Sequence, residues 1–253
     1  MNPHDYCQQK AAASGSSFYY SFLFLPPERR QAIMALYAFC REVDDVVDEC
    51  HDLSLAQTKL EWWRGEVTRM FGGDPTHPVG QALKEVLPRY ELPREQFLEI
   101  IDGMQMDLQQ TRYLHFADLR LYCYRVAGVV GLMAAEIFGY RDRATLKYAH
   151  DLGIAFQLTN IIRDVGEDAR RGRIYLPIDD LQRFHVTAKD ILDARPSEAF
   201  KSLMEFQTER AEGFYQQAFS HLPDCDRKAQ RPGLVMAAIY RTLLREIQAD
   251  GYQ

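Results

Sequence analysis

The stretch QLTNIIRDVGED, residues 157–168, lies in a long segment with helical spacing that begins near Ala144. At about 100° per residue, this helix has one polar stripe, while its other faces carry leucine and isoleucine. The members of the stripe are Gln157, Asn160, Asp164 and Asp168. Asparagine is a poor residue for the middle of a helix, so Asn160 needs a reason other than helix stability. The stretch therefore predicts a helix whose polar stripe has a function.

A second acidic cluster, REVDDVVDE at residues 41–49, closes a helix that is expected to begin near Pro27. The same angular spacing predicts a buried stripe made of Ile33, Leu36, Val43 and Val47. The residues expected along one edge of that stripe are Tyr37, Arg41, Asp44 and Asp48. Asp45 and Glu49 are expected to point toward water.

Each acidic cluster contains the pattern D-x-x-x-D, which stacks two carboxylates one turn apart, about 6 Å along the helix axis. Two such pairs at the edges of apolar faces repel each other unless cations lie between them. Mg²⁺ accepts a few carboxylates together with phosphate oxygens. We therefore expect the two helices to face each other across a cleft and to hold a diphosphate through Mg²⁺.

The simpler alternative is a pair of solvated helix faces. A single acidic cluster is more often solvated than metal-binding, and Asp164 and Asp168 could pair with Arg163 and Arg170 at the surface. The joint occurrence of two acid pairs, one of them sharing its stripe with two amides, favours the metal site.

The rest of the chain also has helical spacing, without convincing runs of alternating apolar and polar residues. Proline and glycine separate the segments at residues 25–28, 72–78, 87–93, 139–142, 170–177, 194–197 and 222–233. A chain of 253 residues is near the upper limit for one hydrophobic core. We expect one all-α domain, residues 1–253, with about eight or more helices.

Composition excludes several classes of protein. The net charge of −6 without a long lysine or arginine run argues against a nucleic-acid partner. Five scattered cysteines indicate reduced thiols in a cytosolic compartment. The longest apolar stretch near the N-terminus, residues 18–27, is too short to cross a bilayer, so we expect a soluble or peripheral protein. The seven histidines show no metal-ligand spacing, which argues against a metallohydrolase.

Three stretches together resemble the squalene/phytoene synthase family of head-to-head prenyl transferases. They are residues 14–49 (SGSSFYYSFLFLPPERRQAIMALYAFCREVDDVVDE), 121–131 (LYCYRVAGVVG) and 155–177 (AFQLTNIIRDVGEDARRGRIYLP). The resemblance implies the single-domain isoprenoid synthase fold, a helical bundle around a central apolar cavity, and Mg²⁺ as cofactor.

The resemblance also implies roles for individual residues. The metal ligands would be Asp44, Asp48, Asn160, Asp164 and Asp168. The substrate contacts would be Ser17, Phe18, Tyr37, Arg41, Gln157, Asn160, Arg173 and Tyr175. The catalytic residues would be Tyr122, Tyr37 and Arg173. Tyr122 shares a predicted helix face with Val126, Val129 and Met133, so its ring is expected to face an apolar space, although its residue type alone suggests a core tyrosine.

Within this family, the three stretches are most similar to bacterial presqualene diphosphate synthases of hopanoid biosynthesis. This implies a transferase that condenses two farnesyl diphosphate molecules into presqualene diphosphate and releases diphosphate. Phytoene, dehydrosqualene and full squalene synthases are alternatives, as is a catalytically silent relative that acts in binding or assembly. We expect a cytoplasmic protein, with peripheral contact to the inner face of the cell membrane and the oligomeric state left open.

Overall fold

A computed structural model describes residues 2–50 and 52–252. The α-helices of these residues are α1 (Pro3–Ala13), α2 (Ser17–Phe22), α3 (Pro27–Glu49), α4 (Leu53–Gly72), α5 (Pro78–Val86), α6 (Arg94–Gln109), α7 (Phe116–Cys123), α8 (Val129–Phe138), α9 (Ala144–Arg170), α10 (Ile178–Arg183), α11 (Ala188–Leu192), α12 (Glu198–His221) and α13 (Arg231–Ala249). A π-helical turn, η1 (Tyr124–Gly128), joins α7 to α8, and a short 3₁₀ turn, η2 (Asp224–Asp226), precedes α13. Between residues 2 and 252, the β-type pairing is limited to one isolated bridge, between Arg112 and Ile174. The prediction of an all-α fold is confirmed.

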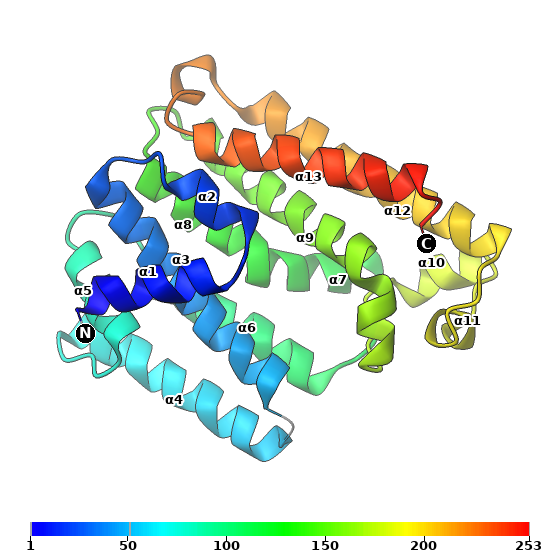
Figure 1. Ribbon diagram of the computed structural model, residues 1–253, viewed down its shortest axis with the longest axis horizontal. Helices are drawn as coiled ribbons and strands as arrows, with labels where there is room; N and C mark the ends of the chain where they lie inside the picture. The colour runs from blue at the N-terminus through cyan, green and yellow to red at the C-terminus, as the bar shows by residue number, and fades with distance from the viewer. Residues whose placement is uncertain (1, 51, 253) are drawn as a thin grey trace.

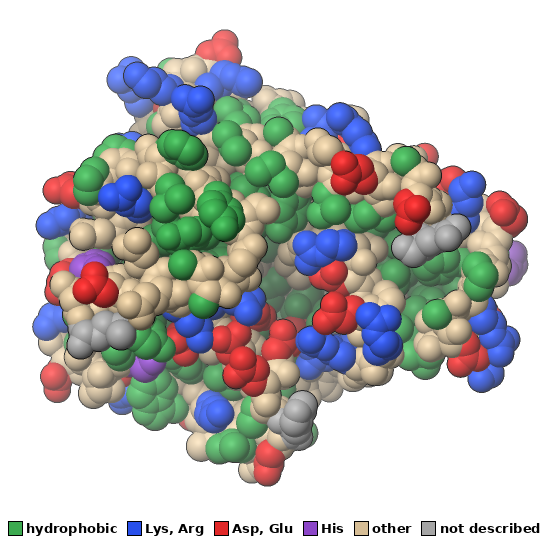
Figure 2. All heavy atoms as spheres, viewed as in Figure 1, with side chains coloured by type: hydrophobic (Ala, Val, Ile, Leu, Met, Phe, Trp, Pro, Cys, Tyr) green, Lys and Arg blue, Asp and Glu red, His purple; other side chains and the backbone are tan. Residues whose placement is uncertain are grey.

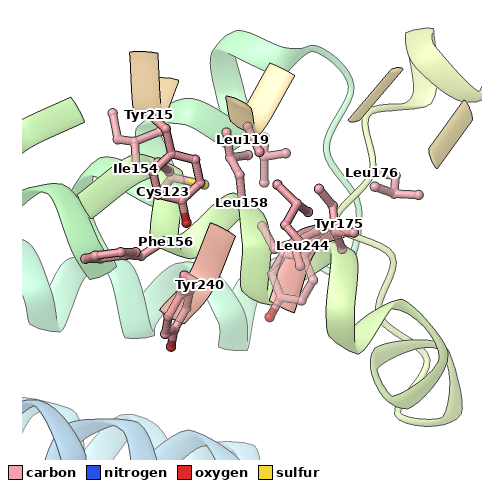
Figure 3. Packing of buried hydrophobic residues seen from close by; sticks show 14 of the residues in the cluster. Leu119, Cys123, Ile154, Phe156, Leu158, Tyr175, Leu176, Tyr215, Tyr240 and Leu244 are labelled. Carbon is pink, nitrogen blue, oxygen red and sulfur yellow. The ribbon is translucent and has the colours of Figure 1, made fainter. Parts of the chain in front are cut away.

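The helix α9 runs through the middle of the bundle (Figure 1), with α12 and α13 on one side and α7 and α8 on the other. Its apolar faces build a first hydrophobic cluster, the α9 core, which includes Ile154, Leu158 and Tyr215. Figure 3 shows Phe156 beside Tyr240 in this core, with ring centroids 4.9 Å apart. Burial of this helix on several faces explains why its sequence is apolar outside the polar stripe.

A second hydrophobic cluster, the α3 core, forms where α3 packs against α1, α4, α5 and α6. Its members include Leu36, Phe39, Leu60 and Ile101. The stripe predicted for α3 is buried as expected, because Ile33, Leu36, Val43 and Val47 are each at most 6% exposed.

A cavity of about 570 Å³ separates the two cores. Leu36 and Met104 reach it from the α3 core, and Leu152 and Phe156 reach it from the α9 core. The predicted central apolar cavity is therefore confirmed. Because side chains of both cores end at this space, it can take an apolar ligand without exposing either core to water.

The π-helical turn corrects one expectation about the cavity wall. Tyr122 and Val126 line the cavity as predicted, but Val129 and Met133 are fully buried in the α3 core. A π turn holds more residues than an α turn, so it rotates the following helix relative to a regular α-helical projection. The wall continues instead through Ala127, Val130, Gly131, Ala134, Ala135 and Phe138.

One continuous helical stretch, Phe116–Phe138, has the length and composition of a membrane span, with 23 residues and a mean hydropathy of 1.4. Core helices of soluble proteins share these properties. In this protein the stretch packs against α9 and lines the cavity, and 44% of its most apolar window is buried. Packing inside the bundle accounts for its apolar residues.

Two glycines let α9 approach the helix that contains η1 and α8. A Cβ added at Gly153 would lie 2.4 Å from the carbonyl oxygen of Ala127, and one added at Gly131 would lie 2.4 Å from that of Ala149. Both obstacles are backbone atoms, which cannot rotate away. The close contact fixes the position of one cavity wall against α9.

We predict that Gly153→Ala lowers the free energy of unfolding by about 3 kcal/mol, because the new methyl group forces these two helices apart. Gly213→Ala is the control, since a Cβ at Gly213 in α12 meets no atom within 4 Å. This control should raise stability by about 0.5–1 kcal/mol through helix propensity. Urea denaturation measures both, and equal effects would contradict the proposed close contact.

Candidate active site

The α3 helix presents its acids at the mouth of the cavity. Asp44 lines the cavity and accepts a hydrogen bond of 2.7 Å from the Arg41 guanidinium. Glu49 is exposed, as predicted. The expectation for Asp45 is wrong, because its carboxylate lies 2.7 Å from Lys10 of α1 and 3.0 Å from Arg41 instead of pointing toward water. The packing of α1 across α3, which helical projection of α3 alone does not include, explains this difference.

The polar stripe of α9 borders the same mouth. Gln157 and Asn160 line the cavity, and the Asn160 amide nitrogen lies 3.4 Å from the Gln157 side-chain oxygen. The side-chain oxygen of Asn160 is buried and has no hydrogen-bond partner among the described residues. Asp164 forms a two-pronged ion pair with the neighbouring Arg163, at 2.6 and 2.7 Å. The surface pairing considered as an alternative therefore does occur for Asp164, with Arg163 as its partner.

Two arginines directly after α9 bring the acid pairs of the two helices together. The Arg171 guanidinium lies 3.2 Å from the Asp48 carboxylate, and that of Arg173 lies 3.8 Å from the same oxygen. Asp48 of α3 thus lies close to the residues that follow the C-terminal end of α9. Figure 2 shows acidic and basic side chains around a hollow in this face of the molecule. These ion pairs bring the end of α3 close to the segment that follows α9.

Asp107 of α6 is a site residue that sequence analysis missed. It is 8% exposed and accepts hydrogen bonds from the hydroxyls of Tyr122, at 2.8 Å, and Tyr175, at 2.7 Å. The two tyrosine rings stack with centroids 5.2 Å apart. A signal existed, since Asp107 follows Ile100 and Met104 on the apolar stripe of α6, where an acid is unusual.

Three acids of the site hold their protons more tightly than usual. Burial raises the pKa of Asp44 to about 6, that of Asp107 to about 6 and that of Asp168 to about 7. Neighbouring carboxylates contribute in each case: Asp48 raises the pKa of Asp44, and Asp164 that of Asp168. Burial is the largest cause in all three cases, and it disfavours the charged form of each carboxyl group.

The remaining predicted residues fall into two groups. Ser17, Phe18, Tyr37, Arg41 and Tyr122 line the cavity, and the Tyr37 hydroxyl donates to the Ser14 hydroxyl at 3.2 Å. The residues outside the cavity wall are Asp48, Asp164, Asp168, Arg173 and Tyr175. Tyr175 reaches the site through its hydrogen bond to Asp107, and the other four lie near the C-terminal ends of α3 and α9.

The aromatic residues in and just after α2 also fall into two groups, those that line the cavity and those that are exposed. Phe18 and Phe22 line the cavity. Tyr20 and Phe24 do not contribute to it, because they are 62% and 92% exposed.

The donor set of the mouth fits a hard divalent cation. Aspartate and amide oxygens are the ligands that Mg²⁺ prefers, and the buried Asn160 oxygen without a partner is one of them. Among the described residues, three His, Cys, Asp or Glu side chains do not converge closely enough to hold an ion. A bound Mg²⁺ would therefore need further oxygens, which substrate phosphates supply in many Mg²⁺ sites.

The all-helical bundle around a central apolar cavity is the isoprenoid synthase fold. The chain belongs to the squalene/phytoene synthase family, whose family model matches residues 11–253. Members of this family are enzymes that act on prenyl diphosphates, and the predicted family membership is confirmed.

Similar proteins agree with this assignment. The chain is 40% identical over 262 residues to a phytoene synthase of Arthrospira platensis, covering 98% of this chain and 85% of that protein. It is 37% identical to the chloroplastic phytoene synthase 1 of Arabidopsis thaliana and spans 60% of that protein. Among solved structures, squalene synthase HpnC from Alicyclobacillus acidocaldarius superposes with a TM-score of 0.89 at 29% identity, covering 99% of this chain and 95% of that one. A ligand-bound dehydrosqualene synthase superposes with a TM-score of 0.87 at 31% identity, covering 99% of this chain and 87% of that one.

We predict that Asp107→Asn becomes more stable relative to the wild type as the pH rises, in the absence of divalent metal. The Asp107 carboxyl titrates near 6 when folded and near 3.8 when unfolded. Its contribution to stability is thus fully present below about pH 4 and is lost as the pH rises through 6. Denaturant titrations measure the free energy of unfolding of both proteins at pH 4 and at pH 8. The difference between the variant and the wild type should change by roughly 3 kcal/mol between these two pH values. A stability difference between the two proteins that does not change with pH would contradict the raised pKa of Asp107.

Proposed function

We propose that this protein condenses two farnesyl diphosphate molecules head-to-head into presqualene diphosphate and releases diphosphate. One observation carries the proposal. Asp44 lines a cavity between two apolar cores, and Asp48, one turn further along α3, pairs with Arg171 and Arg173 just after the acid-bearing end of α9. A charged headgroup bound at the mouth would have its prenyl tail inside.

The residues that would hold Mg²⁺ are Asp44, Asp48, Asn160, Asp164 and Asp168. When bound, the metal would neutralise charge on the leaving diphosphate, as a Lewis acid does. Arg41 and Arg173 would add guanidinium contacts to the same diphosphate. Their existing ion pairs with Asp44 and Asp48 keep them at the mouth before substrate arrives.

The cavity walls would protect the allylic cation that forms when diphosphate leaves. The two apolar cores would keep water away from the cation, so that it would not be quenched to an alcohol. Aromatic faces stabilise cations without acting as nucleophiles, and Phe18 and Phe156 both line the cavity, with ring centroids 5.5 Å apart. The second farnesyl chain would then attack the cation through its double bond.

Closing the cyclopropane ring requires the loss of one proton. Tyr122 lines the cavity, and its hydroxyl donates a hydrogen bond of 2.8 Å to the Asp107 carboxylate. The phenol oxygen could accept the substrate proton while Asp107 takes the phenol proton. This relay leaves the tyrosine neutral and the charge balanced.

A second candidate is a phytoene synthase reaction, which starts with the same type of half-reaction on geranylgeranyl diphosphate. It is favoured by the curated relatives, since phytoene synthases match at 36–40% identity. The length of the cavity decides between the two substrates.

We predict that Asp44→Asn and Asp164→Asn each lower turnover of farnesyl diphosphate by about 100-fold in the presence of Mg²⁺. Each substitution removes a charge from the proposed metal site and leaves the size of the side chain unchanged. Glu49→Gln is the control, because Glu49 belongs to the same acidic cluster but is exposed. Its turnover of farnesyl diphosphate should stay within a few-fold of the wild-type value. The assays are run with and without NADPH, and mass spectrometry identifies the product as a cyclopropyl diphosphate or a hydrocarbon. Full turnover in both aspartate variants, or in EDTA, would refute the proposal.

We also propose that the protein works in the cytoplasm with one face resting on the membrane. Tyr20 and Phe24 of the α2 region are exposed beside α13, where Val235 and Ile239 are each 42% exposed. Figure 2 shows a patch of hydrophobic side chains over these elements. Because Ile239 also lines the cavity, the patch is continuous with the proposed tail-binding space.

Basic side chains flank the patch on both sides. Arg30 donates to the Leu23 carbonyl oxygen at 3.2 Å, directly beside Phe24. Arg231 precedes Val235 and Ile239 at four-residue spacing, so the three share one face of α13. Exposed aromatic residues bordered by arginine are typical of surfaces that bind anionic lipid.

We predict that the double substitution Tyr20→Ser with Phe24→Ser reduces binding to phosphatidylglycerol-containing vesicles by about 10-fold or more, because apolar area is lost at the interface. Leu53→Ser in α4, a similarly exposed residue away from the patch, should bind like the wild type. Vesicle co-sedimentation measures both. A wild-type protein that stays in the supernatant would rule out this membrane face.

A further inference from the structure

We propose that Tyr113 is a positioning residue, whose ring holds Tyr122 and Tyr175 in place so that both of their hydroxyls stay on Asp107. This inference rests on the proposed function, because it concerns the proton relay of the same site. Tyr113 does not line the cavity, so it acts only through the two other tyrosines. Three observations carry the inference: the packing of the rings, the backbone contacts of Tyr175, and the surroundings of the Tyr113 hydroxyl.

The rings of Tyr113, Tyr122 and Tyr175 form a closed triangle. The ring centroid of Tyr113 lies 5.7 Å from that of Tyr122 and 5.9 Å from that of Tyr175, and the last two lie 5.2 Å apart. The planes of Tyr113 and Tyr175 stack at 21° to each other. None of the three residues is more than 9% exposed. In a close-packed interior, Tyr113 therefore fills the space into which the two other rings would otherwise tilt.

The loop that carries Tyr113 also holds the backbone of Tyr175. This loop joins α6 to α7 and runs beside the segment that joins α9 to α10. The Ile174 amide donates to the carbonyl oxygen of Thr111 at 3.0 Å, and the Ile178 amide donates to that of Tyr113 at 2.9 Å. Tyr175 lies in the chain between these two bonds. One short loop thus fixes both the backbone and the ring of Tyr175.

The Tyr113 hydroxyl separates a packing role from a hydrogen-bonding role. Its oxygen is buried and has no hydrogen-bond partner among the described residues. An unpaired buried hydroxyl costs free energy, so this group does not explain why the residue is suited to its position. The hydroxyls of Tyr122 and Tyr175, in contrast, both donate to Asp107. The part of Tyr113 that matters is therefore its flat ring.

The proton relay depends on the orientation that Tyr113 maintains. Tyr122 has to face the cavity and keep its hydrogen bond to Asp107 at the same time, which requires a ring locked by its neighbours. An allylic cation that is not carried on to the cyclopropane is captured by water: a carbon–oxygen bond forms, the water loses a proton, and a prenyl alcohol results. Misplacement of Tyr122 should therefore change the products without preventing the departure of diphosphate at the mouth.

Removing the flat ring is the first test. Tyr113→Met keeps a flexible apolar side chain in the core. With farnesyl diphosphate and Mg²⁺, we expect its ratio of prenyl alcohol to cyclopropyl diphosphate to rise by at least about 10-fold, since small displacements of a catalytic group are costly. Its kcat for the cyclopropyl product should fall by about 10- to 100-fold while KM stays within about 3-fold, because Tyr113 makes no contact at the mouth. An unchanged product ratio would overturn the inference.

Two further variants separate positioning from a general loss of stability. Tyr113→Phe keeps the ring and removes the unpaired hydroxyl, so its product ratio should stay within about 2-fold of the wild-type value. Tyr215→Met is the matched control, since Tyr215 is also fully buried in the α9 core but does not line the cavity. This control loses stability, and its product ratio should not change. A raised alcohol ratio in Tyr113→Phe or in Tyr215→Met would overturn the assignment to the Tyr113 ring.

Crystal structures separate failure of this inference from failure of the proposed function. If the wild type forms no cyclopropyl diphosphate, the proposed reaction is wrong. Structures of the variants still show the position of Tyr122 without turnover. In Tyr113→Met, the Tyr122 hydroxyl should lie more than about 3.5 Å from the Asp107 carboxylate, beyond hydrogen-bond distance. In Tyr113→Phe it should stay at the wild-type distance of 2.8 Å. An unchanged distance in Tyr113→Met overturns the inference.

Discussion

The cost of ionising carboxyl groups that are withdrawn from water is the constraint on which this site depends. Asp44, Asp107 and Asp168 all have pKa values raised to about 6 or 7 by burial, in a region that α3, α6 and α9 share. The ion pairs of Asp48 with Arg171 and Arg173 offset part of this charge. A cation and a diphosphate together would balance more of it, which is why the site is suited to a metal-bound headgroup and poorly suited to a neutral ligand.

The sequence was sufficient for the parts that depend on single helices. The predicted starts of α3 near Pro27 and of α9 near Ala144 agree with the structure, because proline or glycine marks the breaks before them. Helical projection placed Gln157 and Asn160 on one stripe, and both line the cavity. The family resemblance added the bundle and its central cavity, which no single-helix pattern contains.

The parts that required the structure depend on contacts between helices or on irregular backbone. Asp45 pairs with Lys10 because α1 crosses α3, and Asp107 joins the site only because α6 carries it there. The π turn at Tyr124–Gly128 moves Val129 and Met133 out of the cavity wall. Regular helical spacing cannot show a local change in the number of residues per turn. The stacking of Tyr113 on Tyr175 likewise joins two segments that are far apart in sequence.

The site therefore has a charged mouth and an apolar interior, and the central claim is that the facing acids bind a divalent cation together with a diphosphate. Anomalous diffraction from crystals soaked with Mn²⁺ and inorganic pyrophosphate tests this claim most directly. The account predicts manganese peaks between the Asp44/Asp48 pair and the Asp164/Asp168 pair, with pyrophosphate density beside them. Manganese bound elsewhere, or pyrophosphate held by arginines alone with the two acid pairs empty, would contradict it.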